Sequence, residues 1–218
     1  MIEHVYRRAM AARSIDAVVV ATDDPRILSA VERFGGAALL TSPSHPSATD
    51  RLAELAVSLP CSLIVNVQGD EPMLDPGVID ATVAAMLQDV SIEIATAARP
   101  VRGSELSNPH VVKVVTDQHG FALYFSRAPI PFGRDGSTVD LARAHIGLYA
   151  YRREVLLRLA QLPPTPLECA EALEQLRALE HGIRIKVVNT TYESLGVDTP
   201  EDLEHVRNLV KEFREGNS

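Results

Sequence analysis

The sequence has few cysteines, few lysines and no tryptophan. Its two cysteines, Cys61 and Cys169, are too few for a disulfide framework in a chain of 218 residues. Each lies in an apolar run, where we expect a small buried side chain. No apolar stretch approaches the ~20 residues of a membrane span, and the N-terminus has no signal-peptide core. These absences favour a cytoplasmic protein that makes no membrane contact.

Acidic residues outnumber basic ones, and only three of the basic residues are lysines. The chain has 29 acidic and 21 basic residues, a net charge of −8, so no basic face for nucleic acid is visible. A nucleoside triphosphate carries about four negative charges, which a metal rarely neutralises without Lys or Arg. No Gly-rich or basic phosphate-binding loop follows an early strand, and the chain begins inside a helix. The sequence therefore shows no complete binding site for a triphosphate.

The first hundred residues alternate between short apolar runs and amphipathic segments. Strands are expected at 16–21, 37–41, 62–67 and 92–97, and helices at 1–12, 49–59 and 76–88, with one more beginning at Asp23-Asp24-Pro25. This rhythm predicts a parallel sheet with flanking helices, in which 16–21 and 62–67 are buried.

The pattern changes after residue 100. Apolar runs at 111–116 and 121–125 around Asp117-Gln-His-Gly120 predict a hairpin. A strand at 146–151, a helix to about 161, a helix at 167–179 and a strand at 183–189 follow. Thr199, Pro200 and Asp202 then form the start of a last helix, with Thr199 as the N-cap.

Asp70 is the strongest candidate for a functional carboxylate. It follows the strand at 62–67, and Gly69 lets a ligand approach the backbone. A carboxylate at a strand end suits Mg²⁺, which prefers carboxylates and phosphate oxygens. The alternative is an Asx-type turn or a helix cap. Asp198 has a similar position, after a short strand and a Gly-Val turn, and a second metal carboxylate is one option for it.

Two further groups of polar residues remain open to a structural explanation. Glu171, Glu174 and Gln175 share one face of the expected helix at 167–179, which by pattern alone is a solvated face. His145 and Tyr149 are four residues apart in an expected strand and so point the same way. Hydrogen-bonded core residues are the plainer interpretation.

Six motifs occur in one order along the chain. They are 66–72 (NVQGDEP), 123–128 (LYFSRA) with Ile130-Pro131, 145–149 (HIGLY), 166–168 (PLE), 173–177 (LEQLR) and 196–203 (GVDTPEDL). In these motifs the sequence resembles the 3-deoxy-manno-octulosonate cytidylyltransferases, or CMP-Kdo synthetases, over essentially its whole length. The resemblance implies transfer of CMP from CTP to the sugar acid Kdo, with release of pyrophosphate, for lipopolysaccharide synthesis.

The resemblance also implies a fold and a set of site residues. The fold is a Rossmann-like, glycosyltransferase-A-like mixed sheet in a single α/β domain over 1–218, with an inserted hairpin subdomain at about 99–150 for substrate binding and dimerisation. Asp70 and Asp198 match the family's Mg²⁺ ligands. The matching Kdo-binding residues are Gln68, Arg127, His145, Tyr149, Glu174 and Gln175. The matching nucleotide-binding residues are Ser47, Thr49 and Arg51.

These residue types suit the implied chemistry. Arg127 can pair with the carboxylate of a sugar acid, and the amides, hydroxyl, imidazole and carboxylate of the other five suit its hydroxyls. Two acidic ligands can hold Mg²⁺ between the triphosphate and the attacking hydroxyl, so no protein nucleophile is required.

Two departures from the family pattern stand out. Ala48 replaces a glycine, and its methyl group could disturb a positive-φ backbone or crowd the base of the nucleotide. Met1-Ile2 matches the segment that follows the family's N-terminal strand and Arg/Lys loop. The resemblance therefore implies either a misassigned start codon or an N-terminal truncation, and little or no pyrophosphate release by the chain as given. The alternatives are a cytidylyltransferase for another sugar acid, of the sialic-acid type, and a non-catalytic remnant that binds a sugar acid.

Overall fold

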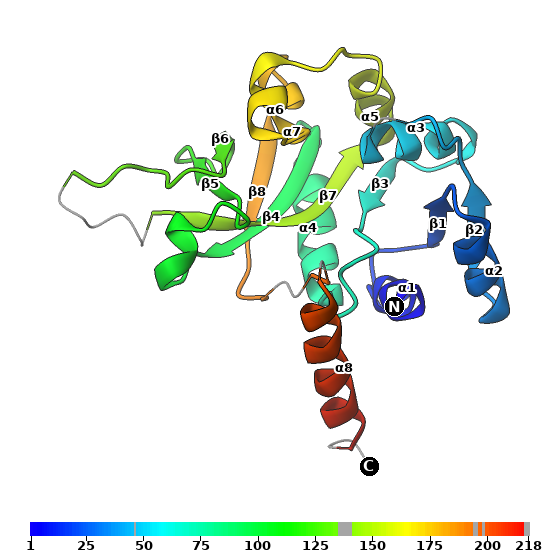
Figure 1. Cartoon of the computed structure of the whole chain (residues 1–218). Coiled ribbons are helices and arrows are strands. Elements are labelled where there is room, and N and C mark those ends of the chain that lie inside the picture. The colour runs from blue at the N-terminus through cyan, green and yellow to red at the C-terminus, as the bar shows by residue number, and fades with distance from the viewer. Residues whose placement is uncertain (46, 135–140, 194–195, 198, 216–218) are drawn as a thin grey trace.

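The computed structural model describes residues 1–45, 47–134, 141–193, 196–197 and 199–215. Its main sheet has six strands, in the order β6-β5-β7-β4-β8 with β3 also paired to β7. The strands are β3 (Leu63–Asn66), β4 (Ile94–Pro100), β5 (Lys113–Thr116), β6 (Ala122–Ser126), β7 (Arg143–Arg152) and β8 (Ile185–Asn189). Only β4 and β8 are parallel, so the sheet is mixed (Figure 1), as the resemblance implied.

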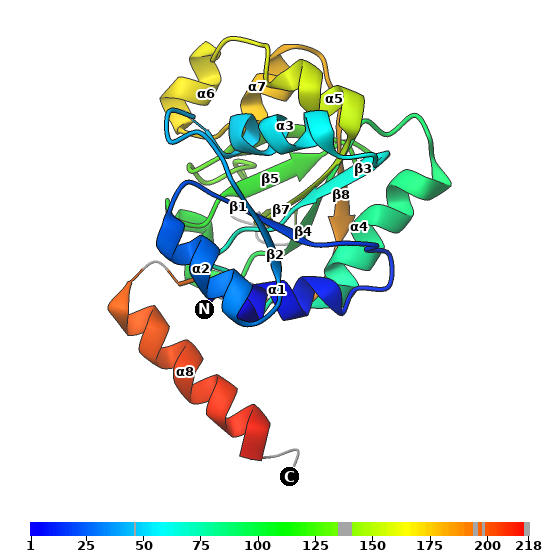
Figure 2. The ribbon, with the colours of Figure 1, turned by 90° about the vertical axis from the view of Figure 1, so that its right-hand side faces the viewer.

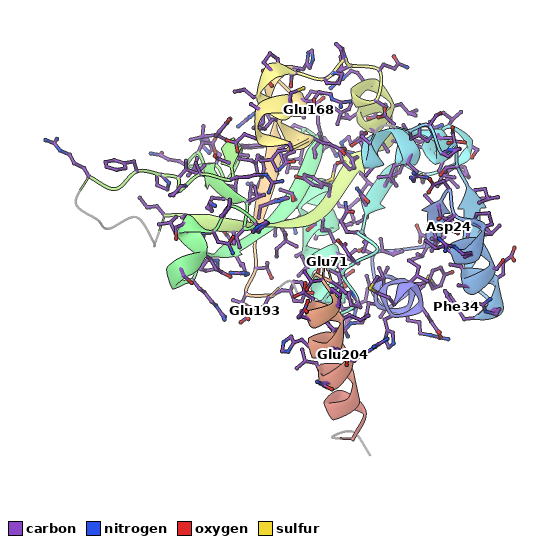
Figure 3. The ribbon with its side chains drawn as sticks, viewed as in Figure 1. Asp24, Phe34, Glu71, Glu168, Glu193 and Glu204 are labelled. Atoms are coloured by element: carbon purple, nitrogen blue, oxygen red, sulfur yellow. The ribbon has the colours of Figure 1, made fainter. Side chains whose placement is uncertain are left out.

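A second sheet contains only β1 (Val19–Thr22) and β2 (Ala37–Leu40), which run parallel. They are joined by α2 (Pro25–Arg33), whose N-cap Asp24 (Figure 3) accepts from the Arg26 backbone N–H at 2.7 Å and is followed by Pro25. The Asp-Asp-Pro signal for this helix is therefore confirmed.

The expectation of one parallel sheet through residue 100 is wrong. The β1–β2 pair stands apart from the main sheet, and β3 pairs antiparallel with β7. The alternation of strands and helices does not reveal that the later strand β7 inserts beside β3 and β4. The expected burial of the first and third strands is also wrong, because only their last residues, Thr22 and Asn66, are buried.

Two helical layers enclose the main sheet. One contains α3 (Ala48–Ser58), α5 (Arg153–Leu159), α6 (Pro166–Glu171) and α7 (Gln175–Glu180), which gather at one end of the molecule (Figures 1 and 2). The other contains α1 (Ile2–Met10) and α4 (Pro76–Gln88), which pack on Ala97, Ile146 and Leu148. A short 3-10 helix spans Gly103–Ser107, and α8 (Pro200–Glu215) extends away from both layers.

Local signals were reliable at two other places. The hairpin of β5 and β6 is confirmed, since Asp117 accepts from the His119 and Phe121 backbone N–H groups and Gly120 has a φ of +75°. The start of α8 is also confirmed, because Thr199 and Asp202 hydrogen-bond each other's backbone N–H groups.

The single helix expected at 167–179 is wrong. The structure has α6 and α7, separated by Ala172 in the left-handed conformation with φ +51°. The Arg127 guanidinium donates to the carbonyl oxygens of Glu171 and Ala172 at this break, at 2.8 and 3.4 Å. The interruption of the helical pattern therefore coincides with contacts from a residue that is distant in the sequence.

The two cysteines also differ from expectation. Cys61 is partly exposed and Cys169 is exposed, and both are free thiols. Cys169 lies on the outer side of α6, because this short helix turns Glu168 inward instead. Among the helices that the structure describes, none is long and apolar enough to cross a membrane.

Candidate active site

A cavity of about 450 Å³ opens between the sheet and the layer of α3 and α7. Its walls include all six residues that the resemblance assigned to the sugar acid, and Thr49 from the nucleotide segment. These side chains come from the segment after β3, the end of β6, β7 and the α6–α7 junction: Gln68, Arg127, His145, Tyr149, Glu174 and Gln175. Residues spread over more than a hundred positions thus meet at one polar cavity.

A β-bulge shapes the floor of the cavity. Tyr149 pairs with Thr96, but the next pair is Ile146 with Ala97, so two β7 residues lack partners on β4. One of them, Gly147, lines the cavity. Bulges of this kind redirect side chains and occur often beside active sites. His145 and Tyr149 both line the cavity, as the expected strand predicted. The strand between them is irregular, because the bulge lies there.

Four aromatic rings form a row, and three of them, those of His145, Tyr149 and Tyr151, line the cavity. Phe125 meets His145 edge-on at 5.2 Å between ring centroids, and His145 lies 5.2 Å from Tyr149. Tyr149 stacks on Tyr151 at 5.8 Å. Burial lowers the pKa of His145 to about 3, so its imidazole is neutral at physiological pH. A neutral imidazole offers one donor and one acceptor to a hydroxyl-rich ligand.

The Tyr149 hydroxyl is a buried polar group that points to ligand binding in this cavity. The residue is only 8% exposed, and its Oη has no hydrogen-bond partner in the described part of the chain. A buried polar group without a partner costs roughly 1–3 kcal/mol. Burial also raises the pKa of Tyr149 well above its usual value, so the phenol stays protonated. It is available to donate to an acceptor in the cavity.

Glu174 connects the expected sugar and nucleotide segments. Its carboxylate accepts from the Thr49 hydroxyl at 2.8 Å and lies 3.4 Å from the backbone nitrogens of Ala48 and Thr49. These N–H groups belong to the first turn of α3, where a negative charge is favourable. Ala48 is the first residue of that helix, and Ala172 is the only described non-glycine residue with positive φ. The expected backbone disturbance at Ala48 is therefore absent.

The Arg127 guanidinium is held by three backbone carbonyls. Nε donates to Glu171 at 2.8 Å, Nη1 to Pro109 at 3.1 Å and Nη2 to Ala172 at 3.4 Å. A guanidinium has five N–H donors. Two therefore remain for a ligand, on a side chain whose position is fixed.

The backbone around Arg127 is fixed as well. Glu171 accepts from the Ser126 hydroxyl at 2.6 Å and from the Arg127 N–H at 2.9 Å. The buried Lys113 donates to the Arg127 carbonyl oxygen at 2.5 Å and to two other backbone carbonyls. Burial lowers the pKa of this lysine. Glu171 therefore serves the site and is not part of the solvated helix face that the pattern indicated.

Ser47 and Arg51 do not line the cavity. Ser47 is the N-cap of α3 and accepts from the Asp50 backbone N–H at 3.2 Å. Arg51 donates to Thr41 at 2.5 Å and lies 3.2 Å from Asp23. Of the three expected nucleotide residues, only Thr49 therefore faces the cavity in this structure.

Of the two expected metal ligands, only Asp70 belongs to the described residues. The backbone carbonyl of Asp70 accepts from the Val197 N–H at 2.9 Å, which brings the residue before Asp198 beside Asp70. Asp198 itself lies outside the described residues. Within those residues, no group of three His, Cys, Asp or Glu side chains could hold a metal. Mg²⁺ in phosphate-transfer sites is often bound through only one or two carboxylates and substrate oxygens, so the two aspartates fit it.

Sequence reasoning missed two residues of the site. Tyr151 lines the cavity and lies two positions after Tyr149, so strand periodicity could have found it. Thr96 is fully buried behind His145 and has no sequence signal, because its role depends on the bulge.

Comparison with known proteins identifies the class. The fold is that of a nucleotidyltransferase, and a family model described as cytidylyltransferase matches residues 1–185. A solved 4-diphosphocytidyl-2C-methyl-D-erythritol synthase from Anaerococcus prevotii shares the fold, with a TM-score of 0.64 at 16% identity over 96% of this chain and 88% of that one.

More similar proteins narrow the class to one family. The 3-deoxy-manno-octulosonate cytidylyltransferase of Geotalea daltonii is 50% identical over 97% of this chain and 88% of the relative, and that of Anaeromyxobacter sp. is 54% identical over 96% and 86%. A structure of CMP:2-keto-3-deoxy-manno-octonic acid synthetase complexed with CTP matches with a TM-score of 0.93 and 42% identity, over 97% of this chain and 87% of that one. The chain belongs to the 3-deoxy-manno-octulosonate cytidylyltransferase family.

Proposed function

We propose that this protein transfers CMP from CTP to Kdo and releases pyrophosphate. The observation that carries the proposal is the convergence of all six residues expected to bind Kdo on one cavity, in a chain about half identical to CMP-Kdo synthetases. In the reaction, the anomeric hydroxyl of Kdo attacks the α-phosphorus of CTP. The new O–P bond replaces the bond to pyrophosphate, and the hydroxyl proton is lost.

The residues around the cavity each bind a different group of Kdo. The two free N–H donors of Arg127 bind the Kdo carboxylate, since guanidinium and carboxylate match as a charged bidentate pair. Tyr149 donates to a sugar oxygen, which satisfies its buried hydroxyl. Gln68, Gln175 and Glu174 offer amide and carboxylate partners to the remaining hydroxyls.

We propose Mg²⁺ as the cofactor, held by Asp70 and Asp198. When bound there, it would lower the pKa of the attacking hydroxyl and stabilise charge on the α-phosphate. The hydrogen bond from the Val197 N–H to the Asp70 carbonyl oxygen supports this pairing, because Val197 precedes Asp198 in the sequence. A homodimer and a substrate and dimerisation role for 99–150 remain predictions from the resemblance, and a cytoplasmic location remains a prediction from the composition of the sequence.

Product formation tests this function. We expect CMP-Kdo, detected by mass spectrometry, from CTP, Kdo and Mg²⁺ at a level above that of the Asp70→Asn variant. Sialic acid should give no CMP adduct. CMP-sialic acid instead of CMP-Kdo would favour the other sugar-acid type, and no product above that of Asp70→Asn would favour a non-catalytic remnant. If both Asp70→Asn and Asp198→Asn kept full activity, the metal assignment would be wrong.

A further inference from the structure

The hydroxyl of Thr96 lies between His145 and the bulge in β7. Thr96 is fully buried, and its Oγ1 is 2.7 Å from the carbonyl oxygen of Leu148 and 3.0 Å from Nε2 of His145. The carbonyl oxygen of Ile146 is 3.4 Å away. The hydroxyl therefore occupies the point at which the β4–β7 ladder is interrupted.

The geometry fixes the direction of each hydrogen bond. A carbonyl oxygen can only accept, so the single proton of the Thr96 hydroxyl is donated to Leu148, at the usual distance for an O–H···O bond. The Thr96 oxygen is then left with lone pairs, and the proton between it and His145 has to come from Nε2. In a neutral imidazole with its proton on Nε2, the other nitrogen, Nδ1, is an acceptor.

The surroundings keep the imidazole neutral and the second nitrogen available. Burial opposes protonation of His145, which is partly exposed toward the cavity that it lines. In the described part of the chain, Nδ1 makes no hydrogen bond, while the ring contacts Phe125 in an edge-on arrangement and Tyr149 in a tilted one. A bare acceptor nitrogen beside a cavity for a polyhydroxylated ligand is suited to receive a hydroxyl proton.

We propose that Thr96 is a positioning residue that holds His145 as the neutral Nε2–H tautomer, so that Nδ1 accepts a hydrogen bond from a hydroxyl of the sugar acid. The proposal rests on the proposed function for the identity of the ligand, but the tautomer itself does not depend on any ligand. This role also explains why a threonine is buried in β4, where the other buried residues are alanine and isoleucine.

Three variants separate positioning from a purely structural role. Thr96→Val has the same shape without the hydroxyl, and Thr96→Ser keeps the hydroxyl. Thr82→Val is the matched control, because Thr82 is also fully buried and donates to a carbonyl oxygen, that of Val78 at 2.8 Å, but lies in α4 away from the cavity.

The decisive readout is the nitrogen NMR spectrum of histidine-labelled protein without substrate. We expect the wild type, Thr96→Ser and Thr82→Val to show His145 as a single Nε2–H tautomer between pH 6 and 8. Thr96→Val should lose this preference and show a mixture or the Nδ1–H form. An Nδ1–H tautomer or an imidazolium in the wild type would overturn the proposal, and this result does not require that Thr96→Val fold.

Kdo affinity, measured by calorimetry, tests the consequence for the ligand. Thr96→Val should bind Kdo roughly tenfold more weakly, as the loss of one oriented neutral hydrogen bond implies, and Thr96→Ser should restore the wild-type affinity. An equal loss in Thr82→Val, or no loss in Thr96→Val, would overturn the role of Thr96. Absence of Kdo binding by the wild type would contradict the proposed function, while the tautomer result would stand separately.

Discussion

The buried ion pair of Arg177 and Glu168 allows the sharpest prediction about stability. The two side chains are only 6% and 9% exposed, and the guanidinium binds both carboxylate oxygens, at 2.5 and 2.8 Å. Glu168, labelled in Figure 3 where α6 meets α7, also accepts from the Thr165 backbone N–H at 3.1 Å. Burial raises the pKa of Glu168, but the hydrogen bonds and charge of Arg177, together with the hydrogen bonds from Thr165, outweigh it and lower the pKa overall.

Arg177→Met removes the guanidinium and leaves the buried Glu168 carboxylate without an opposite charge. We expect this variant to lose about 3–5 kcal/mol of unfolding free energy, a large share of the 5–15 kcal/mol typical of a domain. Urea unfolding at pH 7.5, followed by circular dichroism, measures the loss. In the variant the pKa of Glu168 lies above its unfolded value, so the deficit should shrink as the pH falls below that raised pKa.

Two comparisons control this experiment. Arg158→Met breaks the exposed pair with Glu93 and should cost no more than about 1 kcal/mol. The double variant Arg177→Met/Glu168→Leu removes both charges and should recover most of the stability. A loss below about 1 kcal/mol in Arg177→Met, or a double variant as unstable as the single one, would refute the reasoning.

Two further predictions concern backbone strain and pH. Ala172→Gly should raise stability by about 1 kcal/mol, because a Cβ is unfavourable at φ +51°; a thermal melt should show Tm rising by about 2–4 °C, and a fall would contradict the strain argument. His145 has a pKa of about 3 when folded and about 6.5 when unfolded, so its contribution is complete above pH 6.5 and is lost as the pH falls toward 3. Between pH 8 and 5.5, the wild type should therefore lose about 1.4 kcal/mol more unfolding free energy than His145→Gln, as measured by urea unfolding. Equal losses in the two proteins would show that the folded imidazole has an ordinary pKa.

Short-range signals in the sequence predicted the ends of elements well. Asp24 with Pro25, Thr199 with Asp202, and the Asp117 turn each satisfy backbone groups within a few residues, so their effect depends little on the rest of the fold. Long-range contacts were not predictable in this way. The break at Ala172 is contacted by the distant Arg127, and the antiparallel partner of β3 is the later strand β7.

The site shows the same division between local and distant causes. Spacing alone placed Glu171 on a solvated helix face, whereas the structure shows it holding Ser126 and the Arg127 backbone. The convergence of Gln68, Arg127 and Glu174 came only from the resemblance to a family. Thr96 was not accessible to either kind of reasoning, because its contact with His145 exists only through a bulge.

The most direct test of the central claim is calorimetric titration of Kdo into the wild type and into Tyr149→Phe. The variant removes only the buried hydroxyl that has no partner among the described residues. We predict saturable binding of Kdo to the wild type and roughly tenfold weaker binding to Tyr149→Phe, because the hydroxyl finds its partner only on the sugar acid. Equal affinity in both proteins would contradict the assignment of this cavity as the sugar-acid site.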